Sequence, residues 1–318
     1  MSARRLRADV GSAMDHKFIF VDVFADQPFS GNQLAVFPDA RGLSDRAMQA
    51  LAREINFAET TFVLPARLDG ALRRVRIFTP KTEVPFAGHP TIGTAAVLAH
   101  LGVLEWHVDV AKATFEEGVG PVRVTVSRGV APFFTELALE SSVEIPAVRP
   151  DGGRVAAALS LEPADLLDCW FASVGLPFCF VHVASRAAVD RACLERSVWR
   201  DSIANGWSPH LYFFAGDLGG EARDAKLYAR MFAPALGLEE DPATGSGAAA
   251  LAGTLAARAH GDGMDADVAL DIEQGVAMGR PSRIHASATK RAGIVNRVSV
   301  AGSSVIVGRG TMHVPDGH

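Results

Sequence analysis

The feature that most constrains the fold of this chain is an internal repeat. RIFTP at residues 76–80 is followed by GTAA at 93–96, and RMFAP at 230–234 is followed by GAAA at 247–250. The offset between the two copies is 154 residues for both motifs. Self-similarity of this kind indicates a repeated supersecondary unit. We therefore predict two similar halves, each with a strand, a loop and a helix in the same order.

A second pair of similar segments lies before the first pair in each half. FIFVDV at residues 18–23 resembles FCFVHV at 178–183, with an offset of 160 residues. We interpret these segments as equivalent first strands of the two halves.

Alternating apolar and polar residues predict that strands dominate the chain. Such alternation is typical of half-buried strands, which we expect to pair antiparallel. The predicted strands cover residues 18–24, 60–64, 73–78, 122–126, 134–140, 180–183, 210–214, 227–232, 266–272 and 297–307.

Helices are fewer. Ser44 is a suitable N-cap for the first of them. We predict helices at residues 45–54, 91–101, 161–170 and 246–259. The second and fourth are apolar on every face, which places them inside a domain. Gly102 and Gly261 follow them where a left-handed C-terminal cap is expected.

The repeat predicts an α+β protein of two pseudo-symmetric domains, each a mostly antiparallel sheet wrapped around one central helix. We expect a flexible tail at residues 1–13, an N-terminal domain at 14–130 and a C-terminal domain at 131–318. The boundary falls near 129–132. The last strand, within 299–314, could return to the first domain.

The starts of the two central helices carry the candidate binding residues. A helix N-terminus has unpaired N–H groups and a partial positive charge, so it favours a carboxylate. Gly88 and His89 stand at the first helix start, and Gly245 and Ser246 stand at the second. The repeat places Asp241 opposite His89 if the halves face each other. We therefore predict a cleft that contains two helix N-termini, a histidine and a carboxylate.

Glu59 is the third candidate group of this cleft. It enters a predicted strand between small and apolar neighbours, in NFAETTF. Burial there would raise the pKa of its carboxyl and suit it to general acid and base catalysis. A surface glutamate, a structural histidine and a capping aspartate are the ordinary alternatives for Glu59, His89 and Asp241.

The motifs GNQLAVF, NFAETTF, PFAGHPTIG, EDPATGSG and QGVAMGRPS together resemble the phenazine-biosynthesis isomerase (PhzF-like) family, from about Phe18 to Gly310. The resemblance implies the diaminopimelate-epimerase fold, with a site between two similar domains. It also implies a cofactor-free isomerase, a homodimer, and a small carboxylate-bearing substrate of the trans-2,3-dihydro-3-hydroxyanthranilate type.

By the same resemblance, Glu59 is the acid and base that moves a proton between substrate carbons, and His89 and Asp241 assist it. These three are the implied catalytic residues. Asn32, Gly88, Gly245 and Ser246 are implied as substrate-binding residues. Two departures affect the substrate: Gln33 stands where proline is common in the family, and Gly247 where alanine is common.

Several other functions are disfavoured. Related two-base racemases of this fold use a cysteine at each helix start, but Cys169, Cys179 and Cys193 lie elsewhere. Residues 245–250 match a dinucleotide-binding G-x-G-x-x-A pattern, but no predicted strand precedes them. The cysteines also lack metal-site spacing. We therefore predict no nicotinamide, flavin or metal.

Composition bears on partners and location. The formal net charge of −5 provides no basic field for nucleic acid. Apolar runs are too short to span a membrane, and an odd number of cysteines without a disulfide pattern fits a reducing cytoplasm. Two alternatives stay open: an epimerase or racemase of an amino-acid-like molecule, and a non-catalytic small-molecule binding protein.

Overall fold

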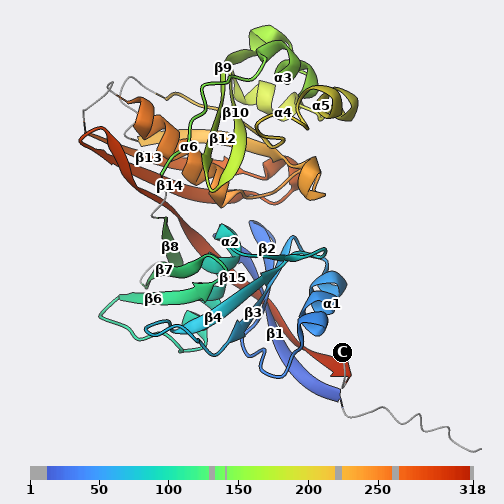
Figure 1. The fold of residues 1–318 in the computed structure, drawn as a ribbon, viewed down its shortest axis with the longest axis vertical. Coiled ribbons are helices and arrows are strands. Elements are labelled where there is room, and N and C mark those ends of the chain that lie inside the picture. Colours follow the sequence, from blue (N-terminus) through green and yellow to red (C-terminus); the bar gives the residue numbers. More distant parts are fainter. Residues whose placement is uncertain (1–12, 129–132, 140–141, 219–223, 260–264, 316–318) are drawn as a thin grey trace, which may run out of the picture.

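The computed structural model describes residues 13–128, 133–139, 142–218, 224–259 and 265–315. Two lobes are joined by one long strand, and each lobe surrounds a single helix (Figure 1). The lower lobe in Figure 1 contains β1 (Ala13–Val23), β2 (Asn32–Phe37), β3 (Glu59–Leu64), β4 (Arg73–Phe78), β5 (Glu83–Val84), β6 (Val110–Glu117), β7 (Gly120–Ser127), β8 (Phe134–Leu139), α1 (Asp45–Ile55) and α2 (Gly88–His100).

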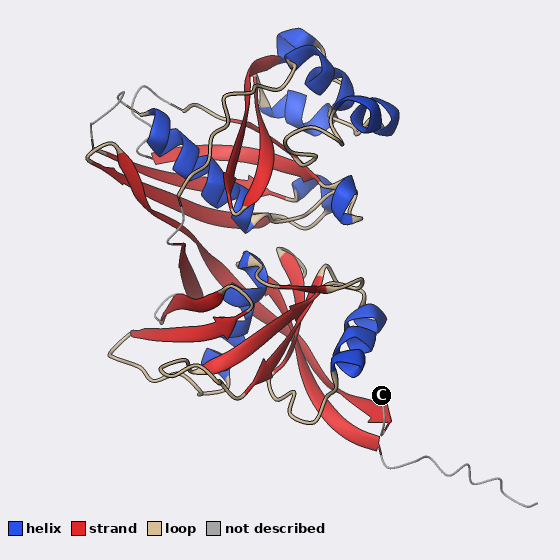
Figure 2. Ribbon diagram, viewed as in Figure 1, coloured by secondary structure: helices blue, strands red, loops and turns tan. Residues whose placement is uncertain are grey.

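The upper lobe is the second copy of this arrangement, with extra helices. Its strands are β9 (Leu166–Val174), β10 (Leu176–Val183), β11 (Leu211–Ala215), β12 (Asp224–Phe232), β13 (Ala266–Gln274) and β14 (Ser282–Arg291). Its helices are α3 (Gly152–Ala158), α4 (Arg186–Arg191), α5 (Arg196–Ser202) and α6 (Gly245–Arg258), with short 3-10 turns at Pro163–Asp165, Pro234–Leu236 and Val276–Met278. Figure 2 shows α3, α4 and α5 outside the sheet and α6 within its curve.

The strand β15 (Ile294–Pro315) connects the two lobes. Its first part pairs antiparallel with β14, residues 298–303 pair with β8, and residues 304–315 pair with β1. The strands from β1 to β8 and β15 therefore form a closed ring around α2. The C-terminal strand thereby lies against the first half as well as the second.

The order of strand pairings repeats between the halves. In the first half β1 pairs antiparallel with β2, β2 parallel with β3, β3 antiparallel with β4, and β4 parallel with β6. The series from β9 to β13 has the same sequence of directions. Four neighbouring pairs are thus parallel, where alternation alone had predicted antiparallel strands.

This topology corrects one predicted equivalence. The counterpart of β1 is β9, and the counterpart of β10 is β2, so residues 18–23 and 178–183 are not equivalent strands. The similarity of their amino-acid sequences has a local cause. Both strands place aromatic and branched residues where apolar cores lie on both faces, as Phe180 and Val181 do in β10.

The 154-residue offset, in contrast, joins equivalent elements. It relates β4 to β12 and α2 to α6, and both helices are buried along most of their length. The predictions of a helix after Ser44 and of a left-handed glycine at 102 are confirmed: the Ser44 hydroxyl accepts from Ala47 N, and Gly102 has φ +72°. Gly261, and the predicted boundary at 129–132, lie outside the described residues.

The predicted helix at residues 161–170 is wrong. Only Pro163–Asp165 forms a short 3-10 turn, and Leu166–Val174 is the strand β9. Trp170 and Ala172 face the core around α6, while Phe171 between them faces the outer helices. Pairing with β10 buries both faces and overrides the local helical spacing of leucines.

The sequence predicts that no segment is long and apolar enough to span a membrane. Within the described ranges, no helix is both long enough and apolar enough to cross a membrane.

Candidate active site

The N-termini of the two central helices meet between the lobes. Gly88 begins α2 and Gly245 begins α6, and a Cβ added to Gly88 would lie 3.9 Å from the backbone nitrogen of Ser246. In the described structure neither helix has a side-chain cap hydrogen bond. The first N–H groups of both helices are therefore available to an anion at this junction.

Glu59 and His89 approach each other at the first helix start. Glu59 is the first residue of β3 and His89 is the second residue of α2, and Glu59 Oε2 lies 3.4 Å from His89 Nε2. The side chains are 19% and 8% exposed. Both atoms are buried, and neither has a hydrogen-bond partner among the described residues. Glu59 Oε2 and His89 Nε2 are thus adjacent to each other, and each lacks a hydrogen-bond partner in the described structure.

Burial changes the protonation of both groups. Desolvation, and secondarily the charge of Asp241, raises the pKa of Glu59 to about 8. Desolvation lowers the pKa of His89 to about 3, against the opposing effect of a hydrogen bond with the Gln33 backbone. The imidazole is therefore neutral near pH 7, and the contact with Glu59 is not an ion pair. A carboxyl with a raised pKa is a stronger base once it ionises.

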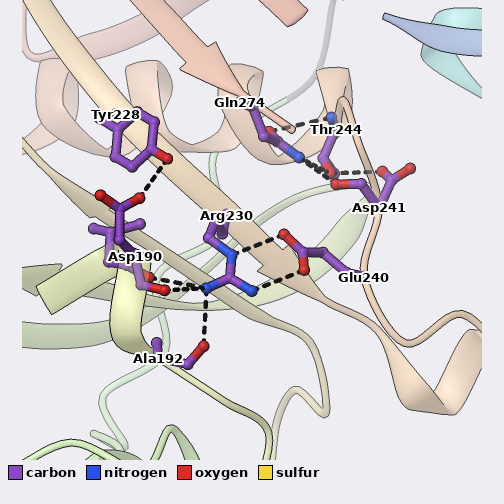
Figure 3. Close-up of polar contacts among 9 residues, drawn as sticks. Asp190, Ala192, Tyr228, Arg230, Glu240, Asp241, Thr244 and Gln274 are labelled. Carbon is purple, nitrogen blue, oxygen red and sulfur yellow. Dashed lines mark hydrogen bonds and ion pairs between the residues drawn. The ribbon is translucent and has the colours of Figure 1, made fainter. Parts of the chain in front are cut away.

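Asp241 lies opposite, in the turn before α6, where Figure 3 shows it beside Thr244 and Gln274. Its carboxylate accepts hydrogen bonds on both oxygens. Asn32 Nδ2 donates to Oδ1 at 2.9 Å, and Thr244 Oγ1 donates to Oδ2 at 2.6 Å. Gln274 Nε2 donates to the Asp241 carbonyl at 2.8 Å. Burial raises the pKa of Asp241 to about 6, although these side-chain hydrogen bonds lower it.

Asn32 connects the two lobes. It begins β2, and its amide nitrogen donates to Asp241 and to the carbonyl of Ala243, at 3.1 Å. Both amide N–H groups are therefore used within the protein, and the side-chain oxygen is the part left for a substrate. The role of Asn32 in binding stays a prediction.

Sequence reasoning missed an arginine–glutamate pair that holds the turn before Asp241. Arg230 on β12 donates to Glu240 through Nε at 2.8 Å and through a terminal nitrogen at 2.9 Å (Figure 3). Its other terminal nitrogen donates to three carbonyls at the end of α4, those of Val189, Asp190 and Ala192. The pair fixes the residue directly before Asp241. Such a fork-to-fork geometry is specific to arginine.

The internal repeat is the sequence feature that could have indicated this pair. Arg76 is the counterpart of Arg230, and it forms the same two-point contact with Glu83, at 2.7 and 2.6 Å. Glu83 lies in the segment that leads to His89. Each half therefore fixes the approach to its central helix with an arginine from the preceding strand.

Arg230→Met is expected to lower the free energy of unfolding by about 3 kcal/mol, because Glu240 would be left half-buried and unpaired. Because this turn positions Asp241, its displacement should also lower kcat/KM about tenfold. Denaturant unfolding and steady-state kinetics measure the two effects. The control is Arg186→Met, which breaks the exposed pair with Glu273 and should cost less than about 1 kcal/mol.

Glu117 is a second group that sequence reasoning missed. It ends β6 behind the start of α2, where Thr91 Oγ1 donates to its Oε1 at 2.8 Å. Burial raises the pKa of this carboxyl to about 8, against the hydrogen bond from Thr91. The acid is therefore neutral near pH 7 and supports the first turn of α2.

Glu117→Gln is expected to flatten the pH dependence of stability. The folded pKa lies above the ordinary value of 4.5, so the folded protein binds this proton more tightly, and stability is lost as pH rises toward 8. Glutamine removes that loss, so the variant should gain relative stability between pH 5 and 8, by up to about 1.4 kcal/mol per pH unit. Urea unfolding at several pH values measures it. A constant difference between the two proteins across this range would contradict it.

The structure brings together the predicted residues of both helix starts with Glu59 and Asn32. The cysteines lie elsewhere: Cys169 and Cys179 are on β9 and β10, Cys193 precedes α5, and burial raises the pKa of the Cys179 thiol. In the described part of the chain, no group of three or more histidine, cysteine, aspartate or glutamate side chains is placed to hold a metal ion.

Comparison with known proteins gives consistent relatives. Residues 21–310 match the sequence profile of the phenazine biosynthesis-like protein family, PhzC-PhzF. The chain is 37% identical over 309 residues to an uncharacterised isomerase of Mesorhizobium japonicum, covering 93% of this chain and 98% of the relative. It is 35% identical over 305 residues to trans-2,3-dihydro-3-hydroxyanthranilate isomerase of Pseudomonas chlororaphis, covering 93% and 99%.

Solved structures agree on the fold. A phenazine biosynthesis protein of the PhzF family from Bacillus anthracis has a TM-score of 0.80 at 23% identity, covering 94% of this chain and 99% of that one. A probable proline racemase from Agrobacterium radiobacter has a TM-score of 0.60 at 16% identity, covering 93% and 92%. The expected diaminopimelate-epimerase-like fold is confirmed. The chain therefore belongs to the phenazine biosynthesis-like (PhzC-PhzF) family and is an enzyme of the isomerase class.

Proposed function

We propose that the protein is a cofactor-independent isomerase of a small carboxylate-bearing substrate of the trans-2,3-dihydro-3-hydroxyanthranilate type, with Glu59 as its acid and base. The observation that carries the proposal is the state of Glu59. Its Oε2 is buried beside His89 without a hydrogen-bond partner in the described structure, and its pKa is about 8. A base at the junction of two helix N-termini can reach a substrate whose carboxylate those helices hold.

The substrate carboxylate binds the backbone N–H groups of Gly88, Gly245 and Ser246. These groups lie at the two helix starts, where a Cβ added to Gly88 would be 3.9 Å from the backbone nitrogen of Ser246. The partial positive charge of both helices favours the anion. A side chain at residue 245 would displace its neighbours, because a Cβ there would lie 3.1 Å from the Phe24 ring.

The ionised Glu59 carboxylate then takes a proton from a carbon of the substrate, and the electrons of that C–H bond move into the conjugated system. Protonated Glu59 returns the proton, from the same face, to another carbon. The product is an isomer, and no electrons enter or leave, so the step needs no redox cofactor. His89, neutral beside Glu59, and Asp241 across the site assist the transfer. Closure of the lobes excludes water and aligns the base.

The experiment is turnover of trans-2,3-dihydro-3-hydroxyanthranilate by the purified chain, followed by absorbance and by mass spectrometry of the product. The proposal requires a product of unchanged mass and a rate that rises with pH as Glu59 ionises toward pH 8. Binding without turnover would instead favour the alternative of a non-catalytic binding protein. Inversion at one carbon, with all double bonds unmoved, would favour the epimerase or racemase alternative.

Two further expectations are a cytoplasmic location, from the cysteine pattern, and a homodimer, from the family resemblance. Both stay predictions. Light scattering of the purified protein measures the oligomeric state, and fractionation of cells that express the tagged chain measures its location.

A further inference from the structure

The repeat gives Tyr212 a counterpart with a different role. Phe62 pairs with Arg76 and Phe213 pairs with Arg230, so Thr61 in β3 corresponds to Tyr212 in β11. The Thr61 hydroxyl is paired inside the first half, at 2.8 Å from Thr94 Oγ1. The same 154-residue offset puts Ala248 at the place of Thr94, and alanine has no group to pair with a tyrosine.

The absence of a side chain at Gly247 leaves room for the Tyr212 ring. A Cβ at residue 247 would be 2.6 and 2.8 Å from two ring carbons of Tyr212, closer than such atoms approach in proteins. The same Cβ would be 3.3 Å from Thr244 Cγ2, so the ring lies against the first turn of α6 near the turn that contains Asp241. The absence of a side chain at Gly247 is thus coupled to the position of this tyrosine.

The Tyr212 hydroxyl is a buried polar group without a hydrogen-bond partner in the described structure. The residue is fully buried, its ring packs against Phe178 and Phe180, and its hydroxyl has no hydrogen-bond partner within the described ranges. Burial, and secondarily the charge of Asp241, raises the pKa of the phenol, so it stays protonated and can donate. An unmade hydrogen bond of a buried hydroxyl costs free energy that a bound ligand can recover.

We propose that Tyr212 is a substrate-contacting specificity residue that donates a hydrogen bond to a hydroxyl group on the substrate, and that Gly247 makes room for it. This inference rests on the proposed function and adds to it the residue that recognises the hydroxyl group of the substrate. Asp241 lies near enough for its charge to act on the Tyr212 phenol, and a substrate hydroxyl between the two groups would accept from Tyr212 and donate to the carboxylate of Asp241. An ammonium group could donate to Asp241 but could not accept from the phenol.

The test compares two stable aromatic ligands, 3-hydroxyanthranilate and anthranilate, that differ only in the hydroxyl. Calorimetry measures the Kd of both ligands with wild type and with Tyr212→Phe. Wild type is expected to prefer the hydroxylated ligand about tenfold, and the variant should lose that preference while its Kd for anthranilate is unchanged. Gly247→Ala displaces the ring, so it should also reduce the preference.

The control is Thr61→Val, which removes the equivalent hydroxyl of the first half. It should destabilise the protein and keep the tenfold preference. Retention of the preference in Tyr212→Phe, or an equal loss of affinity for both ligands, overturns the proposal. Failure of wild type to bind either ligand overturns it as well. Turnover is measured separately, so wild type that shows the preference but no isomerisation would overturn the proposed function and keep the role of Tyr212.

Discussion

Replacement of Glu59 by glutamine is expected to lower kcat about 10²- to 10⁴-fold, the usual contribution of a positioned acid and base. Glutamine has nearly the same shape as the protonated acid, which predominates at neutral pH because the pKa of Glu59 is about 8. The variant should therefore fold normally and still bind substrate. Turnover by absorbance, with thermal unfolding of the same sample, measures both properties.

The matched control is Glu54→Gln. Glu54 is exposed on α1, so its replacement changes the same chemical group outside the site. It should retain wild-type turnover. If Glu59→Gln kept more than half of the wild-type rate, Glu59 would not be the base, and the mechanism proposed for this site would be wrong.

Asp241→Asn is the second large effect. We expect kcat/KM to fall about 10²-fold, because a charged and positioned group opposite Glu59 is lost. The change should also move the pH profile. The charge of Asp241 raises the pKa of Glu59, so its removal lowers that pKa and shifts the limb of kcat/KM that reports Glu59 ionisation to lower pH.

Asp190→Asn serves as the control for this shift. Asp190 accepts a hydrogen bond from Tyr228 at 2.6 Å at the other end of the contacts drawn in Figure 3, away from the helix starts. It should leave the pH profile of kcat/KM in place. A limb that stays at the same pH, or moves upward, in Asp241→Asn would contradict the electrostatic coupling of the two carboxyls.

The repeat made the central architecture predictable. A fixed offset of 154 residues is enough to locate both buried helices and to set Gly88 and Asp241 opposite each other. The structure places those residues together with Glu59 and His89. Strand direction was not predictable in the same way, because alternation reports which faces are buried and not which neighbour a strand pairs with.

The missed residues were not predictable because their roles depend on tertiary contacts. Arg76 and Glu83 are seven residues apart, whereas Arg230 and Glu240 are ten apart, so the pairs do not align at one offset. Glu117 stands beside Glu116 before a hairpin turn, a pattern typical of exposed residues. Its burial depends on α2 packing against the end of β6. Tyr212 likewise gains its significance only from the missing Cβ of Gly247.

The measurement that tests the central claim most directly is the position of deuterium after turnover in heavy water. The substrate is trans-2,3-dihydro-3-hydroxyanthranilate, and NMR of the product locates both the label and the double bonds. Proton transfer by Glu59 between two carbons predicts deuterium on a carbon other than the one that lost its proton, with the double bonds shifted. Internal return of the original proton should keep the labelling below one deuterium per molecule. Deuterium on the carbon that lost its proton, with the double bonds unmoved, would contradict the account and identify an epimerase.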